Sequence, residues 1–141
     1  MTNFAFILDE IKDQIVKHEG YRNKPYRDTE GILTIGIGHN LEEHGLPDEV
    51  IEYIFFKKLR TCIEECRKMF PSFDELSPNR QKALIDMMFN LGYTRLGKFI
   101  KMRKAIANGD YAEAASQMLD SKWAKQVKGR ATTLAEMMHD G

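Results

Sequence analysis

Two acidic residues, Glu19 and Asp28, lie nine positions apart and are followed by a short glycine-rich segment. Gly20 is typical of a helix stop, which places Glu19 in the last turn of the preceding helix. The negative end of the helix dipole favours the protonated form of a carboxyl group at that place. Asp28 precedes a Thr-Glu-Gly turn, where solvent and backbone amides favour the ionised form. One neutral and one charged carboxyl form the pair that cleavage of a glycosidic bond requires.

A helix and a small sheet would position these two carboxyl groups. Apolar residues at three- and four-residue spacing predict a first helix from about residue 4 to 18. Residues 21–40 then change to β-type residues with turn signals between them, which predicts short strands. We expect residues 40–46 to form a short polar loop.

The remainder of the chain has the pattern of helices. Pro47 suits a first helical turn and Pro71 suits a stop, which predicts a long helix over residues 47–69. Ser77 and Gly92 bracket a second helix, and later Gly, Asn and Ser breaks divide the rest into short helices. The sequence therefore predicts an α+β chain that is mainly helical, with one small antiparallel sheet near the start.

A hairpin with its tip at residues 29–31 would give the acidic motif a defined geometry. Asp28 would oppose Ile32 and Tyr26 would oppose Thr34, so Asp28 and Thr34 become diagonal neighbours on one face, close enough to share a water. Two glycines follow Thr34 on that face and leave room for a ligand, while the aliphatic residues between them point into apolar packing. The alternative is that both acids are ordinary surface and turn residues. Each residue taken alone favours that alternative, whereas the set favours a site.

Composition and charge argue against a membrane-inserted protein and against a nucleic-acid-binding protein. The chain has 141 residues, no net charge and no apolar run long enough to span a membrane, so we expect one domain without stable membrane insertion. Residues 1–75 hold 10 basic and 15 acidic residues, and residues 76–141 hold 11 and 6. The basic second half suggests attraction to a polyanion such as nucleic acid, an acidic glycan or an anionic surface, although charge alone favours an ordinary solvated surface. Aromatic residues do not interleave with the basic ones, which argues against nucleic acid.

The sequence gives only weak indications of a metal, redox or dinucleotide-binding site. Cys62 and Cys66 lie four residues apart without a second pair, so two reduced thiols are favoured over a metal or redox site. His39 lacks partners at ligand spacing, so a packed or hydrogen-bonding role is favoured. The segment Gly36-Ile37-Gly38 lacks the third glycine of a dinucleotide-binding loop. We expect no metal and no organic cofactor.

Three short motifs near the N-terminus resemble the active-site region of the T-even bacteriophage lysozymes, glycoside hydrolase family 24. They are Glu-Gly, Tyr-Arg-Asp-Thr-Glu-Gly and Thr-Ile-Gly-Ile-Gly-His. The resemblance covers nearly the whole chain, continuing through residues 83–92, 113–115, 121–123 and 129–131. It implies a lysozyme-like fold in a single domain of residues 1–141. A long helix of about residues 47–69 would join a sheet lobe of about 20–46 to a helical lobe of about 1–19 and 70–141. The first helix would pack on the helical lobe.

The resemblance also implies roles for single residues. Glu19 would be the general acid, Asp28 would position a water, and Thr34 would be the hydrogen-bond partner of Asp28. Arg130 would be an ion-pair partner of Glu19, which opposes the helix dipole and leaves the balance open. The cleft would be lined by Asn40, Phe89, Met102 and Gln117.

Three features depart from the pattern of the family. The 40–46 loop is shorter, Asn40 and Met102 differ from the usual residues, and Asp86 replaces a common amide. These departures concern sugar preference more than the chemistry.

The function implied is hydrolysis of the β-1,4 bond between N-acetylmuramic acid and N-acetylglucosamine in bacterial peptidoglycan, by a monomer. A threonine beside Asp28 suits a held water better than a nucleophilic carboxylate, which predicts inversion. The N-terminus lacks the pattern of a signal peptide, which fits an endolysin held in the host cytoplasm until its release to the periplasm or cell wall. A lytic transglycosylase and a catalytically silent wall-binding protein remain the alternatives, and the set of Glu19, Asp28 and Thr34 argues against both.

Overall fold

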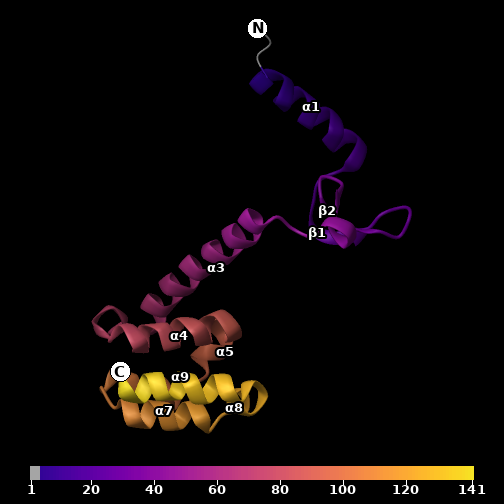
Figure 1. The fold of residues 1–141 in the computed structure, drawn as a ribbon. Helices are drawn as coiled ribbons and strands as arrows, with labels where there is room; N and C mark the ends of the chain where they lie inside the picture. Colours follow the sequence, from indigo (N-terminus) through magenta and orange to yellow (C-terminus); the bar gives the residue numbers. More distant parts are fainter. Residues whose placement is uncertain (1–3) are drawn as a thin grey trace. The chain divides into compact units, whose positions relative to one another are not determined.

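A computed structural model describes residues 4–141 and divides the chain into two compact units. The N-terminal unit ends at Ile51, and the C-terminal unit comprises Glu52–Gly141 (Figure 1). The mainly helical α+β architecture with one small sheet, expected from the sequence, is confirmed. The predicted division into a sheet lobe, a connecting helix and a helical lobe stays a prediction.

The N-terminal unit begins with helix α1, Phe4–Glu19, close to the predicted bounds. Gly20 ends the helix with a φ of +84°, a conformation that glycine adopts without strain. Its N–H donates to the carbonyl of Val16 at 2.8 Å, which closes the last turn. Glu19 is therefore the final residue of α1 and lies in the last turn, where the sequence predicted it.

Three antiparallel strands follow in the order β1-β2-β3: β1 Arg22–Arg27, β2 Leu33–Gly36 and β3 His39–Asn40. Tyr26 pairs with Thr34, which confirms the predicted hairpin register. The register shifts between Arg22 and Tyr26, where Pro25 lacks an N–H for the ladder. This irregularity is tolerated because β1 is an edge strand.

Two local expectations differ from the structure. The 40–46 segment is more than a loop, because it contains the one-turn helix α2, Leu41–His44, which ends at Gly45. On β2, Leu33 and Ile35 are only half-buried, whereas Thr34 is 4% exposed. Thr34 is covered because it lies on the central strand, opposite Tyr26 on one side and Asn40 on the other.

Helix α3, Asp48–Met69, begins in the N-terminal unit and continues into the C-terminal unit, and it confirms the predicted long helix. The 3-10 helix η1, Phe73–Glu75, precedes α4, Pro78–Leu91. The Ser77 side chain accepts from the N–H of Arg80 at 3.2 Å and caps α4, which ends before Gly92 as predicted. The remaining helices are α5 Tyr93–Gly97, α6 Ile100–Ala107, α7 Tyr111–Leu119, α8 Lys122–Val127 and α9 Gly129–Asp140.

The apolar core lies in the C-terminal unit, where α7 and α9 run side by side (Figure 1). It is rich in methionine, an unbranched side chain that fills irregular gaps between helices: Met69, Met87, Met88, Met102, Met118 and Met138 are all buried. Trp123 is also buried, and its indole N–H donates to Asn90 Oδ1 at 2.7 Å. No helix within residues 4–141 is long and apolar enough to cross a membrane.

Candidate active site

The side chain of Glu19 lies against the backbone of Gly38, in the turn between β2 and β3. A Cβ atom at position 38 would come within 2.7 Å of Glu19 Oε2 and 2.8 Å of its Cδ. Gly38 also has a φ of +65°, which disfavours other residues. A β-carbon at Gly36 would meet nothing within 4 Å. The sequence predicted room for a ligand along this glycine segment, and the structure places the carboxyl of Glu19 in part of that room.

Asp28 is fixed by the hairpin turn that follows it. Its Oδ1 accepts from the N–H of Glu30 at 2.8 Å and from the N–H of Ile32 at 2.9 Å. Both hydrogen bonds fall on one carboxylate oxygen, and within residues 4–141 no group donates to Oδ2. The two backbone hydrogen bonds therefore hold the Asp28 carboxyl in one orientation and leave its second oxygen available.

Thr34 is connected to Asp28 through the backbone of one residue, Ile32. The hydroxyl of Thr34 donates to the carbonyl of Ile32 at 2.8 Å. The same carbonyl accepts from the backbone N–H of Asp28 at 3.0 Å, while the Ile32 N–H binds the Asp28 side chain. Because the Thr34 hydroxyl uses its one proton in the hydrogen bond to Ile32, the hydroxyl oxygen of Thr34 can only accept from a further partner. The backbone of Ile32 is a site component that sequence reasoning missed, although the predicted register contained the signal.

Asn40 has a structural role beside Thr34, with which it pairs in the sheet. Its Oδ1 accepts from the N–H of Glu43 at 2.9 Å and caps α2, and its Nδ2 donates to Glu43 Oε2 at 3.3 Å. A substrate that binds this amide has to compete with Glu43. The expected hydrogen-bonding role of His39 is confirmed, because its Nε2 donates to the carbonyl of Gly45 at 2.6 Å.

Phe89 and Arg130, two of the predicted site residues, line one pocket of about 390 Å³ in the C-terminal unit. Arg130 Nε donates to Asp86 Oδ1 at 2.8 Å. Lys58 Nζ lies 4.2 Å from the centre of the Phe89 ring, where a cation is attracted by the π-system. Asp86, which stands where the sequence resemblance has an amide, thus holds the guanidinium. The predicted pairing of Arg130 with Glu19 stays a prediction.

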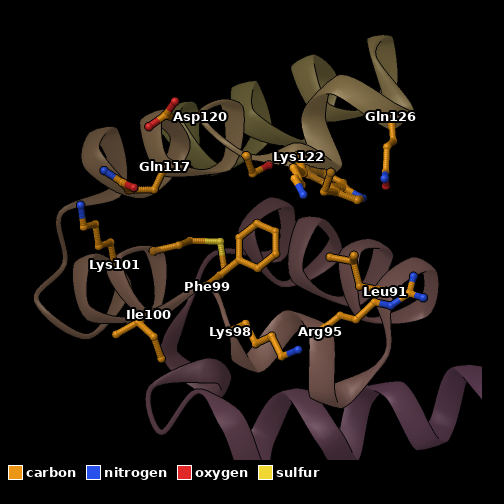
Figure 2. Close-up of a pocket in the computed structure, with 13 residues that line it drawn as sticks. Leu91, Arg95, Lys98, Phe99, Ile100, Lys101, Gln117, Asp120, Lys122 and Gln126 are labelled. Atoms are coloured by element: carbon orange, nitrogen blue, oxygen red, sulfur yellow. The ribbon is translucent and has the colours of Figure 1, made fainter.

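Met102 and Gln117 line a second pocket of the C-terminal unit, with a volume of about 710 Å³ (Figure 2). Met102 is 1% exposed, so it contributes to the pocket floor rather than its rim. The amide of Gln117 donates to Glu113 Oε1 at 2.7 Å, which leaves its carbonyl oxygen available. Of the predicted cleft residues, Met102 and Gln117 thus share one pocket, and Phe89 lines the other pocket together with Arg130, the predicted partner of the acid.

Within residues 4–141, the cysteine thiols and the potential metal ligands form neither a reactive thiol nor a metal site. Cys62 and Cys66 are free and buried. Desolvation by burial is the main cause that raises the pKa of Cys66 to about 12, so its thiol is a poor nucleophile. Among residues 4–141, no group of three or more His, Cys, Asp or Glu side chains is arranged to hold a metal ion.

Comparison with known proteins identifies one family. The sequence model of the family described as phage lysozyme matches residues 16–137. A protein of Dictyostelium discoideum named probable T4-type lysozyme 2 is 26% identical, over 96% of each chain. The SAR-endolysin of Escherichia phage Mu is 28% identical, over 79% of this chain and 64% of that protein. The pre-baseplate central spike protein Gp5 of Enterobacteria phage T4 is 29% identical over 93% of this chain, but over only 28% of its own length.

Proposed function

Because this chain belongs to the phage lysozyme family and is therefore a glycoside hydrolase, we propose that it cleaves the β-1,4 bond between N-acetylmuramic acid and N-acetylglucosamine in peptidoglycan, with inversion. The observation that carries the proposal is the arrangement of Asp28 and Thr34 around the backbone N–H and carbonyl of Ile32. Two oxygen acceptors with fixed backbone partners form a holder for a water molecule.

Glu19 is the general acid of the proposed reaction. It protonates the glycosidic oxygen as the bond to the leaving sugar breaks, which positioned acids accelerate by roughly 10²–10⁴-fold. Its position at the end of α1, against Gly38, supports this role, because the close backbone contact limits where the carboxyl can lie.

Asp28 and Thr34 orient the attacking water. The water donates one hydrogen to Asp28 Oδ2 and the other to the Thr34 oxygen, so that its lone pair is directed at the anomeric carbon. The proton that the water loses on attack passes to Asp28. The hydrogen bond from Thr34 to the Ile32 carbonyl supports donation by the water, because it uses the only hydroxyl proton of Thr34 and leaves the oxygen as an acceptor.

The remaining predicted residues have binding and supporting roles in this proposal. The glycan is contacted by Asn40, Phe89, Met102 and Gln117. Arg130 supports the acid, and no cofactor takes part. We also propose that the protein acts as a monomer and is kept in the host cytoplasm before it reaches the wall.

Two other functions predict different products. A lytic transglycosylase needs one acid and no held water, and it produces an anhydro sugar. A wall-binding protein without activity produces nothing, and it has no use for an acid beside a water holder.

Analysis of fresh digestion products separates the three functions. Purified sacculi are digested with the wild-type protein, and proton NMR is recorded before mutarotation. We expect an initial α-anomer from the β-linked substrate and a product mass that includes one added water. An initial β-anomer excludes inversion, an anhydro sugar identifies a transglycosylase, and intact sacculi identify a binding protein.

A further inference from the structure

Arg27 lies directly before Asp28, at the point where the ladder between β1 and β2 ends. Its backbone pairs with Leu33, which is the last pair of the two strands before the turn. Its guanidinium reaches across the turn, because Nη1 donates to the carbonyl of Gly31 at 3.0 Å. The same nitrogen lies 3.5 Å from Glu42 Oε1 on α2. Arg27 therefore connects the tip of the hairpin to the short helix that follows the sheet.

The carbonyl that Arg27 binds belongs to the peptide group that holds Asp28. The oxygen of Gly31 and the N–H of Ile32 are the two ends of one planar peptide unit. The oxygen accepts from the guanidinium, and the N–H donates to Asp28 Oδ1 at 2.9 Å. Rotation of this unit would break both hydrogen bonds. Glycine has no β-carbon to limit such a rotation, so the hydrogen bond from Arg27 supplies the restraint.

Resting on the function proposed above, we propose that Arg27 is a positioning residue for the carboxyl group of Asp28 that holds the water. It acts through the Gly31–Ile32 peptide unit and touches neither the sugar nor the water. Glu42 assists it by orienting the guanidinium toward the turn. A hydrogen bond from a charged donor is stronger than one between neutral groups, and it polarises the N–H at the other end of the peptide unit.

An exposed arginine can also bind substrate directly, and that role predicts a different result. The side chain of Arg27 is 65% exposed, so a glycan could reach it. Loss of a simple substrate contact raises KM and leaves kcat unchanged. Loss of a positioning residue lowers kcat with little change in KM, because Asp28 and its water act on the bond that breaks.

Two measurements on Arg27→Met separate these roles. Methionine keeps an unbranched side chain but has no donor for the Gly31 carbonyl. Steady-state kinetics on soluble glycan fragments of the wall gives kcat and KM separately. Two-dimensional NMR of the protein without substrate gives the hydrogen-exchange rate of the Ile32 amide, which reports its hydrogen bond to Asp28.

We expect Arg27→Met to lower kcat roughly tenfold and to leave KM within about twofold of the wild-type value. The loss is smaller than the roughly 10²-fold cost of a 1 Å misplacement, because the N–H of Glu30 still holds Asp28 Oδ1. The Ile32 amide should exchange roughly tenfold faster. Arg27→Lys should recover most of the kcat and of the amide protection, since an ammonium group can still donate to the carbonyl.

Lys24→Met is the matched control. Lys24 is exposed on the same strand, so this change removes one positive charge and leaves the hydrogen bond to the Gly31 carbonyl in place. It should leave kcat, KM and the exchange of the Ile32 amide within about twofold of wild type. Circular dichroism and thermal unfolding confirm that each variant folds.

A double variant tests the contribution of Glu42. Glu42→Gln should lower kcat only about two- to threefold, because an exposed ion pair contributes little. Arg27→Met/Glu42→Gln should match Arg27→Met alone, since the effect of Glu42 passes through Arg27.

Three results would overturn the proposal. They are a rise in KM at unchanged kcat, an unchanged exchange rate of the Ile32 amide in Arg27→Met, or an equal loss of kcat in Lys24→Met. The exchange measurement needs no substrate. Its outcome is therefore separate from a failure of the proposed hydrolysis, which the product analysis detects.

Discussion

Replacing Gly38 with alanine tests whether contact with the hairpin is what positions the proposed acid. The new β-carbon would lie 2.7 Å from Glu19 Oε2 and 2.8 Å from its Cδ. Carbon contacts are optimal at about 3.5–4.0 Å, so the carboxyl has to move by about 1 Å. A misplacement of that size can cost about 10²-fold in rate. We therefore expect the kcat/KM for wall clearing to fall by roughly 100-fold.

Gly36→Ala is the matched control, because it imposes similar backbone strain without the contact. Gly36 has a φ of +69° and Gly38 a φ of +65°, but a β-carbon at Gly36 meets nothing within 4 Å. Left-handed backbone costs a non-glycine residue about 1–2 kcal/mol, so urea unfolding should show a similar loss of stability in both variants. Only Gly38→Ala should lose most of its activity in a turbidity assay. Wild-type activity in Gly38→Ala, or equal inactivation of both variants, would refute the reasoning.

Four further predictions concern the acid, the water holder and the C-terminal unit. Glu19→Gln should abolish wall clearing and leave thermal stability unchanged or improved, and normal turnover would remove Glu19 from the mechanism. Thr34→Val should lower kcat roughly 10–100-fold, whereas Thr34→Ser should retain most activity, because only the serine keeps the acceptor oxygen. Burial raises the pKa of Cys66 to about 12, so the unfolded thiol ionises first as the pH rises above about 9. The free energy of unfolding should then fall by up to about 1.4 kcal/mol per pH unit between those values, and urea titrations of Cys66→Ala should show a shallower slope, because burial also raises the pKa of Cys62. Arg80 donates to the carbonyls of Met138 at 2.7 Å and His139 at 3.0 Å, so Arg80→Leu should destabilise the protein by about 1–2 kcal/mol in urea unfolding; a change below about 0.3 kcal/mol would contradict this.

Local signals predicted much of the fold, because they act within a few residues. Gly20 ends α1, and the turn after Asp28 sets the register that pairs Tyr26 with Thr34. The helix α2 was missed, although Asn40 and Glu43 have the spacing of a helix cap and its third residue. The features of the site that were missed are contacts between residues that lie far apart in the sequence.

Contacts between distant segments could not be predicted from local signals. The approach of Glu19 to Gly38 depends on the path of the chain through the strands between them. The spacing of residues along the sequence does not predict that path. The pairing of Arg130 with Asp86 likewise joins α9 to α4 across the C-terminal unit. Sequence resemblance supplied roles for single residues, but the distances came only from the folded chain.

The proposed catalytic groups are held by backbone geometry rather than by an apolar core. Among residues 4–51, Thr34 is the buried side chain, while the apolar core lies beyond Glu52. Asp28 and Thr34 are oriented by the backbone of Ile32, and Glu19 is oriented by a helix end and a glycine. Backbone hydrogen bonds direct an oxygen to one position, which a water holder needs, whereas apolar packing is non-directional. Core substitutions in the C-terminal unit should therefore lower stability while leaving the geometry of Asp28 and Thr34 intact.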